Sequence, residues 1–195
     1  MARILAFAGS ARAGSMNKKL IHVAAKLARE AGAEVTEIDL QDFPLPLYDG
    51  DLEDDQGVPG NAIRIRDLMR DHDGLLLSCP EYNSSITPLL KNTIDWVSRP
   101  ADGQPSLIAF RGKVATLLSA SPGALGGLRG LVHVRAILGN VGVLVLPSQV
   151  AVSQAHKAFS DDGALADEGA AARVEKAVAE LVEVVGKLAV ASGRS

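Results

Sequence analysis

The chain has 195 residues, of which 47% are hydrophobic and 22% charged, and its formal net charge is -3. This length predicts one domain over residues 1–195, and no apolar run approaches the ~20 residues of a membrane-spanning helix. Because the basic residues are scattered and the N-terminus lacks the order of a secretory signal, we expect a cytoplasmic protein with no nucleic-acid and no membrane partner.

The first part of the chain reads as strand, helix, strand and loop. Residues 3–8 are an apolar run typical of a buried strand, and apolar positions recur at helical spacing over residues 20–31, where Gly32 ends the helix. Residues 34–40 alternate as in a second strand. Residues 41–60 contain prolines and glycines, and their five acids between Asp49 and Asp55 do not match a calcium-binding loop, which predicts a solvated surface loop.

The rest of the chain repeats the alternation. We expect a helix over residues 61–70 capped by Asn61, a strand at residues 74–78, and a helix capped by Thr87 with Pro88 in first position. Further elements are predicted at residues 112–119 (strand), 125–139 (helix), 142–146 (strand) and from about residue 170 (helix), while residues 148–160 are ambiguous. Five such units predict a mostly parallel sheet with helices on both faces.

Three polar turns follow predicted strands, at residues 9–17, 79–87 and 119–127. In a parallel sheet, ligands bind beyond the carboxyl ends of the strands. We therefore expect the three turns to form one site.

The first turn, GSARAGSMN, has the composition of an anion site. Backbone N–H groups at a helix start attract phosphate, and Ser10, Arg12, Ser15 and Asn17 supply further donors and one fixed charge. The alternative is that Ser15 or Asn17 simply caps the helix. The turn matches neither G-x-x-x-x-G-K-[ST] nor G-x-G-x-x-G, which favours a monophosphate ligand.

The second turn offers Pro80, Glu81, Tyr82 and Asn83 in succession. Peptide groups and Asn83 could bind the edge of a flat heteroaromatic ring, with Tyr82 as an aromatic wall. An ordinary turn has the same composition, so both interpretations stay open. Trp96, in the helix that follows, is either buried or part of a subunit contact.

Cys79 is the only cysteine, which excludes an internal disulfide. It is either a small core residue or a redox-sensing thiol. The four histidines are far apart in the sequence, and no metal site is expected.

Four motifs in this order resemble the NADPH-dependent FMN reductase family, whose members include flavin, quinone, azo and chromate reductases. The motifs are G-S-x-R-x-x-S-x-N (Gly9 to Asn17), P-E-Y-N (Pro80 to Asn83), L-K-N-x-x-D-W (Leu90 to Trp96) and S-x-S-P-G-x-x-G-G (Ser119 to Gly127). The resemblance covers residues 3 to about 147. It implies a flavodoxin-like three-layer α/β sandwich with five parallel strands in the order 2-1-3-4-5.

The resemblance also implies a cofactor and its ligands. FMN would bind non-covalently, with its phosphate at Ser10, Arg12, Ser15 and Asn17 and its isoalloxazine against Pro80, Glu81, Tyr82 and Asn83. Ser119, Ser121 and Gly123 would close the pocket. Members of this family are commonly dimers or tetramers with the flavin near a subunit interface, so a homodimer or homotetramer is expected.

The implied reaction is a ping-pong hydride transfer from NAD(P)H to FMN, followed by two-electron reduction of a quinone, flavin, azo compound or metal oxyanion. The cofactor carries this chemistry, so no catalytic side chain is expected, and Tyr82 and Asn83 would tune the ring. The alternatives are a flavodoxin-type electron carrier and a nucleotide-binding or phosphoester-hydrolysing protein. Arg12, Arg99 and Arg111 are candidates for a preference of NADPH over NADH, without a spacing rule that chooses between them.

Overall fold

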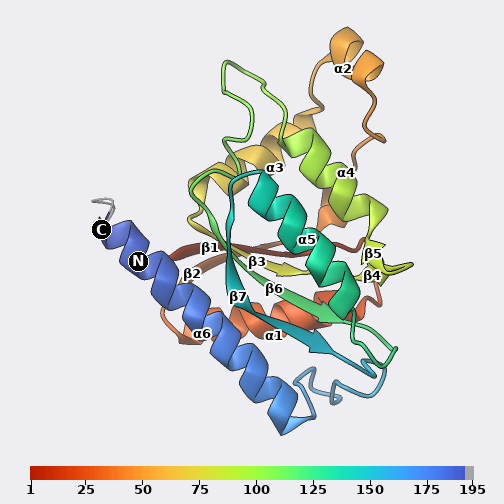
Figure 1. Ribbon diagram of the computed structural model, residues 1–195, viewed down its shortest axis with the longest axis vertical. Coiled ribbons are helices and arrows are strands. Elements are labelled where there is room, and N and C mark those ends of the chain that lie inside the picture. The colour runs from red at the N-terminus through yellow and green to blue at the C-terminus, as the bar shows by residue number, and fades with distance from the viewer. Residues whose placement is uncertain (192–195) are drawn as a thin grey trace.

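A parallel five-stranded sheet forms the centre of the computed structural model, which describes residues 1–191 (Figure 1). The strands are β1 (Arg3–Ala8), β2 (Glu34–Ile38), β3 (Gly74–Ser78), β6 (Val114–Ala120) and β7 (Leu144–Val152). Their order is β2-β1-β3-β6-β7, with every neighbouring pair parallel. This confirms the flavodoxin-like order 2-1-3-4-5.

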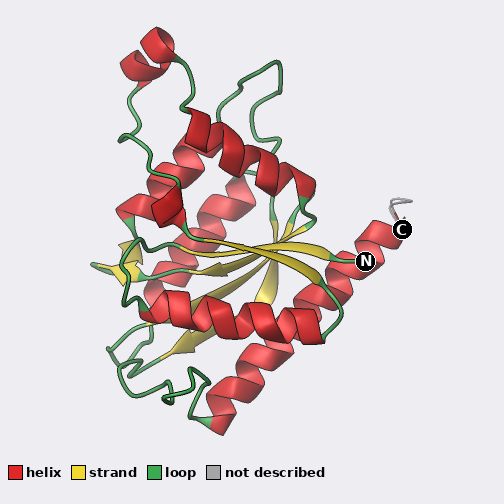
Figure 2. Ribbon diagram, turned by 180° about the vertical axis from the view of Figure 1, so that it is seen from behind, coloured by secondary structure: helices red, strands yellow, loops and turns green. Residues whose placement is uncertain are grey.

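Helices cover both faces of the sheet, as Figure 2 shows. The helices α1 (Met16–Glu30) and α6 (Glu168–Ala191) lie on one face, and α3 (Gly60–Asp71), α4 (Pro88–Val97) and α5 (Leu128–Asn140) lie on the other. Successive side chains of a strand point to opposite faces. In β1, Ile4 and Ala6 therefore join the core under α1 and α6, whereas Leu5 and Phe7 join the other core.

The end of the sheet differs from the prediction at β7, which continues to Val152 although Pro147 lies within it. The register against β6 shifts between Ala115 and Leu117, so that Val145 and then Gln149 find partners. This bulge takes the proline, which lacks an N–H donor, out of the hydrogen-bond ladder of an edge strand.

The starts of two predicted elements are also shifted by glycines. Gly112 has a φ of 74°, so β6 begins after it. Gly126 and Gly127 have φ values of 62° and 93°, and α5 starts only at Leu128. These left-handed conformations favour glycine and interrupt a strand or helix.

The prediction of a plain surface loop over residues 41–60 is wrong. A 3-10 turn, η1 (Leu40–Asp42), and a short helix, α2 (Gly50–Gln56), form there. The Asp49 side chain accepts from the Asp51 N–H at the start of α2, where acidic residues interact favourably with the helix dipole. Helix α2 buries no residue and projects from the body of the molecule (Figure 1).

Residues 44–56, which we call the arm, are held against α4. The Trp96 Nε1–H donates to the Pro46 carbonyl over 2.8 Å, and the Asn92 amide both donates to this carbonyl and accepts from the Tyr48 N–H. The Tyr48 ring meets the Trp96 ring edge-on, with centroids 4.9 Å apart. Trp96 is fully buried in these contacts, which confirms the first of its two interpretations.

An ion pair closes the far end of the arm. Glu53 accepts from the Tyr48 hydroxyl and from the Arg99 guanidinium. The hydrogen bond from Arg99 holds the pKa of Glu53 below its ordinary value. The Arg99 guanidinium therefore holds the arm through Glu53.

Helix α3 begins after Pro59, which has no side-chain cap, so the prediction that Asn61 caps this helix is wrong. Asn61 lies in the first turn, and its amide donates to the Pro44 carbonyl at the start of the arm.

None of the helices in residues 1–191 combines the length and the apolar character needed to span a membrane.

We predict that Asn92→Ala loosens the arm while the sheet stays folded. The substitution removes both hydrogen bonds of the Asn92 amide, so exchange of the Tyr48 backbone amide with deuterium should become about tenfold faster or more. Lys91→Ala is the matched control, because the one side-chain partner of Lys91 within residues 1–191 is Asp95 of the same helix. Equal exchange at Tyr48 in both variants would contradict the assignment.

Candidate functional site

The three polar turns meet at the carboxyl ends of β1, β3 and β6. They enclose a pocket of about 120 Å³. It is lined by Ser10, Arg12, Ser15, Met16, Asn17, Pro80, Glu81, Tyr82, Ala120, Ser121 and Pro122. The structure thus brings eight of the eleven predicted residues to one pocket; Asn83, Ser119 and Gly123 do not line it. Met16, Ala120 and Pro122 carry no functional group by which the sequence could have singled them out.

The first turn combines a helix start with a free positive charge. The Ser15 hydroxyl caps α1 by accepting from the Lys18 N–H, and the Ser10 hydroxyl accepts from the Arg12 N–H. Within residues 1–191, the Arg12 guanidinium makes no hydrogen bond or ion pair. Its five donors are therefore available to an anion.

The charges around the start of α1 are the reverse of the usual pattern. The first turn carries Lys18 and Lys19 and has no acidic residue. Cations at the positive end of a helix dipole are unfavourable. Asp39 offsets Lys18 by an ion pair, whereas Lys19 lies over the Phe159 ring. An anion bound at this helix start would relieve the remaining repulsion.

The sequence suggested that the Asn17 side chain donates to phosphate, but in the structure this side chain binds other parts of the protein. Its amide is buried and accepts from the Ser78 hydroxyl and the Ala120 N–H, over 2.9 and 3.0 Å. It also donates to the Ala120 carbonyl over 2.8 Å. One side chain thus joins α1, the end of β3 and the end of β6. Its contact with phosphate stays a prediction.

Glu81 points toward α5. Its carboxylate accepts from the Gly130 N–H and, through two bonds, from the Arg129 guanidinium. Burial alone would raise the pKa of Glu81, but these hydrogen bonds outweigh burial and hold this pKa below its ordinary value. The carboxylate caps a helix whose own N-cap, Gly127, has no side chain.

The second turn is a two-residue hairpin between β4 (Glu81–Tyr82) and β5 (Ser85–Ile86). Asn83 and Ser84 have φ values of 49° and 67°, as a type I′ turn requires. This explains an asparagine at position 83 through the backbone, while Tyr82 remains 55% exposed at the rim of the pocket.

The first and second turns are held in register by Thr87. Its buried hydroxyl donates to the Gly9 carbonyl over 2.8 Å and accepts from the Leu90 N–H. Gly9 allows this close approach, since a Cβ there would lie 3.0 Å from the Leu90 Cβ. Thr87 therefore fixes the spacing between the two turns and caps α4, as predicted.

The third turn lies closely over the sheet. A Cβ at Gly127 would come within 1.9 Å of the Ser119 Oγ, and a Cβ at Gly126 would overlap the backbone of β7. The Ser119 hydroxyl is fully buried and is the one buried side-chain polar atom in the described residues without a partner. Nearer the pocket, the Gly123 N–H donates to the Ser121 hydroxyl.

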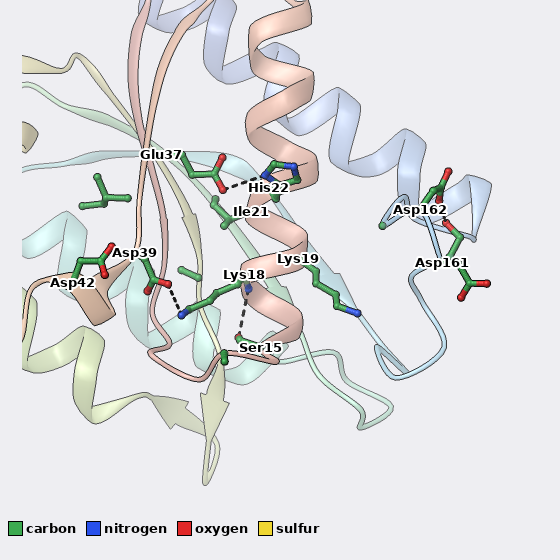
Figure 3. A pocket seen from close by; sticks show the side chains of 15 residues that line it. Ser15, Lys18, Lys19, Ile21, His22, Glu37, Asp39, Asp42, Asp161 and Asp162 are labelled. Atoms are coloured by element: carbon green, nitrogen blue, oxygen red, sulfur yellow. Dashed lines mark hydrogen bonds and ion pairs between the residues drawn. The ribbon is translucent and has the colours of Figure 1, made fainter.

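A larger cleft of about 820 Å³ surrounds the first half of α1 (Figure 3). Lys18 and Lys19 line it together with five carboxylates, those of Glu37, Asp39, Asp42, Asp161 and Asp162. Figure 3 shows Lys18 turned to Asp39 and His22 turned to Glu37. This excess of negative charge repels a phosphorylated ligand. The smaller pocket therefore suits such a ligand better, although Ser15 lines both.

Two of the three arginines considered for nucleotide preference lie elsewhere. Arg99 pairs with Glu53 of the arm, and Arg111 lies beside Asp73 and Gly112 at the amino ends of β3 and β6. Only Arg12 lines the pocket.

Cys79 is a core residue. Its side chain is 1% exposed, and burial raises the pKa of the thiol to about 12. A redox-sensing thiol needs the opposite properties, exposure and a lowered pKa. Across residues 1–191, no group of three or more His, Cys, Asp or Glu side chains is placed to hold a metal ion.

The fold and the three-turn pocket define a flavodoxin-like α/β protein. The profile of a family described as NADPH-dependent FMN reductase matches residues 2–157, which include all three turns. An NAD(P)H-dependent FMN reductase of Pseudomonas aeruginosa is 38% identical over 170 residues, covering 86% of each chain. A quinone reductase of Escherichia coli (strain K12) is 34% identical over 145 residues, covering 74% of this chain and 73% of its own.

Among solved structures, the flavoenzyme NAD(P)H:(acceptor) oxidoreductase FerB of Paracoccus denitrificans superposes with a TM-score of 0.81 and 31% identity. The superposition covers 96% of this chain and 98% of FerB. The chain belongs to the NADPH-dependent FMN reductase family.

We predict that Asn17→Ala lowers the free energy of unfolding by about 2–4 kcal/mol, because it leaves buried groups of Ser78 and Ala120 without partners. Chemical denaturation of the flavin-free protein measures this loss. The absence of ligand separates a structural role from phosphate binding. Ser15→Ala, which removes only a helix cap, should lose about 1 kcal/mol. A loss at Asn17 no larger than at Ser15 would refute the structural role.

We predict that Glu81→Gln removes part of the acid sensitivity of folding. A carboxyl whose pKa is lowered in the folded state stabilises the protein above its unfolded pKa, and this contribution disappears as the pH falls through the folded pKa. Urea unfolding between about pH 7 and pH 3 should therefore show the two proteins diverging near neutrality and converging in acid. A difference that does not depend on pH would contradict the prediction.

Proposed function

We propose that the chain is an FMN-dependent NAD(P)H oxidoreductase that binds FMN non-covalently in the three-turn pocket. The observation that carries this proposal is the Arg12 guanidinium, which has no partner within residues 1–191 and lines the pocket beside the positive end of the α1 helix dipole. The family profile spans the same turns. When bound, FMN would accept a hydride from NAD(P)H and pass two electrons to a quinone, flavin, azo or metal-oxyanion acceptor.

The first turn would hold the FMN phosphate. Arg12 would pair with the phosphate through its forked donors, and the Ser10 and Ser15 hydroxyls and the first N–H groups of α1 would complete the shell. We assign Asn17 to this site mainly through its bonds to Ser78 and Ala120, which hold α1 in place.

The second and third turns would hold the isoalloxazine ring. Tyr82 and Pro80 line the pocket and supply an apolar wall, and the peptide groups at Asn83 would face the ring edge. Ser121 and the N–H groups toward Gly123 would close the other side and stabilise negative charge on the ring. The Ser119 hydroxyl, which has no hydrogen-bond partner in the described residues, lies buried beneath Gly127 of this turn.

We also propose that the protein is a homodimer or homotetramer in which a second copy covers the ring. The pocket of about 120 Å³ is smaller than the ~300 Å³ or more of most ligand sites, so the ring would extend past its rim. Leu125, Leu128 and Val132 are exposed on and just before α5, which contacts the hairpin of Tyr82. An apolar face beside the ring suits a subunit contact.

The expected cytoplasmic location stays a prediction.

The absorbance spectrum tests the function. Purified protein is mixed with FMN and desalted, and NADPH and then NADH are added without oxygen. Retained flavin bands that bleach with either nucleotide support the proposal. Retained flavin that neither nucleotide reduces indicates an electron carrier, and a colourless protein refutes the three-turn site.

We predict that Arg12→Ala weakens FMN binding about 10- to 100-fold, because it removes a charge-assisted pair with the phosphate. Flavin fluorescence during titration measures the affinity, and Arg12→Lys should recover part of it by keeping the charge without the fork. Lys26→Ala, at an exposed position on α1 and outside the pocket, is the control. Equal affinities for Arg12→Ala and Lys26→Ala would argue against phosphate binding here.

A further inference from the structure

A second pocket, of about 290 Å³, lies behind the third turn at the carboxyl end of β7. It is lined by Val152, Ser153, Gln154, Lys157, Ala158, Asp167, Ala170 and Arg173. The predicted site residues include none of these. The pocket lies at the same edge of the sheet as the three-turn site.

The third turn is hydrogen-bonded to the segment that lines the second pocket. Ser121 lines the three-turn pocket, while its N–H donates to the Val152 carbonyl over 3.1 Å and its carbonyl accepts from the Ala155 N–H over 3.0 Å. The Gln154 N–H reaches the Gly123 carbonyl on the same turn. A ligand that lies over the three-turn pocket and extends across Ser121 would therefore approach the second pocket.

The chemistry of this pocket favours an anion. The side chains of Lys157 and Arg173 are exposed and make no hydrogen bond or ion pair within residues 1–191. The side chains of Ser153 and Gln154 also make no hydrogen bond in this part of the chain. All four can donate. The single carboxylate, Asp167, accepts from the Ala170 N–H at the start of α6. The balance is positive, in contrast to the acidic cleft around α1.

The backbone of the pocket is also unusual. Gln154 has a φ of 47°, a left-handed conformation that residues other than glycine rarely adopt. It is held between the Gly123 carbonyl and the Lys157 N–H, which donates to the Gln154 carbonyl over 2.9 Å. Such strained positions cluster at ligand sites. The turn therefore presents Lys157 and the 153–154 peptide in a fixed arrangement.

We infer that this pocket binds a phosphoryl group of the nicotinamide dinucleotide, with Lys157 and Arg173 as its cations; the inference rests on the proposed function. A nicotinamide over the Tyr82 side of the three-turn pocket leaves the rest of the dinucleotide free to cross Ser121. Other nearby cations are engaged: Arg129 pairs with Glu81, and Arg12 is assigned to the FMN phosphate. Two unpaired cations match the charge of a phosphate.

The test compares Lys157→Ala/Arg173→Ala with Lys176→Ala, an exposed lysine one turn further along α6 and outside the pocket. The KM for NADPH and for NADH is measured in the flavin-loaded protein. Calorimetry with adenosine 2′,5′-bisphosphate and with adenosine 5′-diphosphate measures binding without turnover. Because each charge-assisted hydrogen bond contributes roughly tenfold in affinity, the double variant should raise KM and weaken binding by about tenfold or more.

The two nucleotides identify the phosphoryl group. Losses confined to NADPH and the 2′,5′-bisphosphate assign the pocket to the 2′-phosphate, and equal losses with both nucleotides assign it to the diphosphate. Either result supports the inference. It is overturned if the double variant behaves as Lys176→Ala, or if the unaltered protein binds neither adenosine compound. If the unaltered protein does not retain FMN after desalting, the proposed function is refuted instead. The two failures can be told apart because calorimetry measures binding of the adenosine compounds without turnover.

Discussion

The amide of Asn17 is the contact on which the arrangement of the three turns depends. It accepts from Ser78 and Ala120 and donates to Ala120, so it links the first turn of α1 to the ends of β3 and β6. Parallel strands leave their carboxyl ends at one edge but do not fix the helix that starts there. With α1 held by three buried hydrogen bonds, the N–H groups of its first turn and the neighbouring Arg12 have a defined position above the sheet.

Thr87 and Glu81 extend the same principle to the other turns. Thr87 joins the first turn to the second through the Gly9 carbonyl, and Glu81 joins the second to the start of α5. In each case one polar side chain satisfies the end of a helix and also fixes a loop. The site is therefore stiffened by helix capping, and among the charged side chains that line the pocket, Glu81 is engaged in this way whereas Arg12 has no partner in the described residues.

The fold was predictable from the sequence where local patterns decide it. Apolar runs and helical spacing located the sheet strands, and the motif resemblance supplied their order. The arm was not predictable, because α2 buries no side chain. The arm instead depends on contacts of Pro46, Tyr48 and Glu53 with residues of and just after α4 that lie 44 to 50 positions away in the chain. The extension of β7 past Pro147 was missed because a bulge in its pairing with β6, invisible in the sequence, accommodates the proline.

The candidate site was predictable in its residue types and less so in their contacts. Asn17 and Ser119 belong to recognisable motifs, yet the partner of Asn17 at Ala120 is 103 residues distant, and the burial of Ser119 depends on how Gly127 lies above it. No sequence motif indicated the pocket with Lys157 and Arg173, since its residues come from the segment at and after the end of β7 and from the start of α6, and the spacing between these two segments matches no known pattern.

The burial of Cys79 has a chemical consequence for a sulfhydryl that lies one residue from the pocket wall. Burial raises the pKa of the Cys79 thiol to about 12, so the thiol form predominates at neutral pH. Thiolates, not thiols, react with peroxides and disulfides. Cys79, next to Pro80 of the pocket wall, is therefore protected by burial from oxidation of its sulfhydryl.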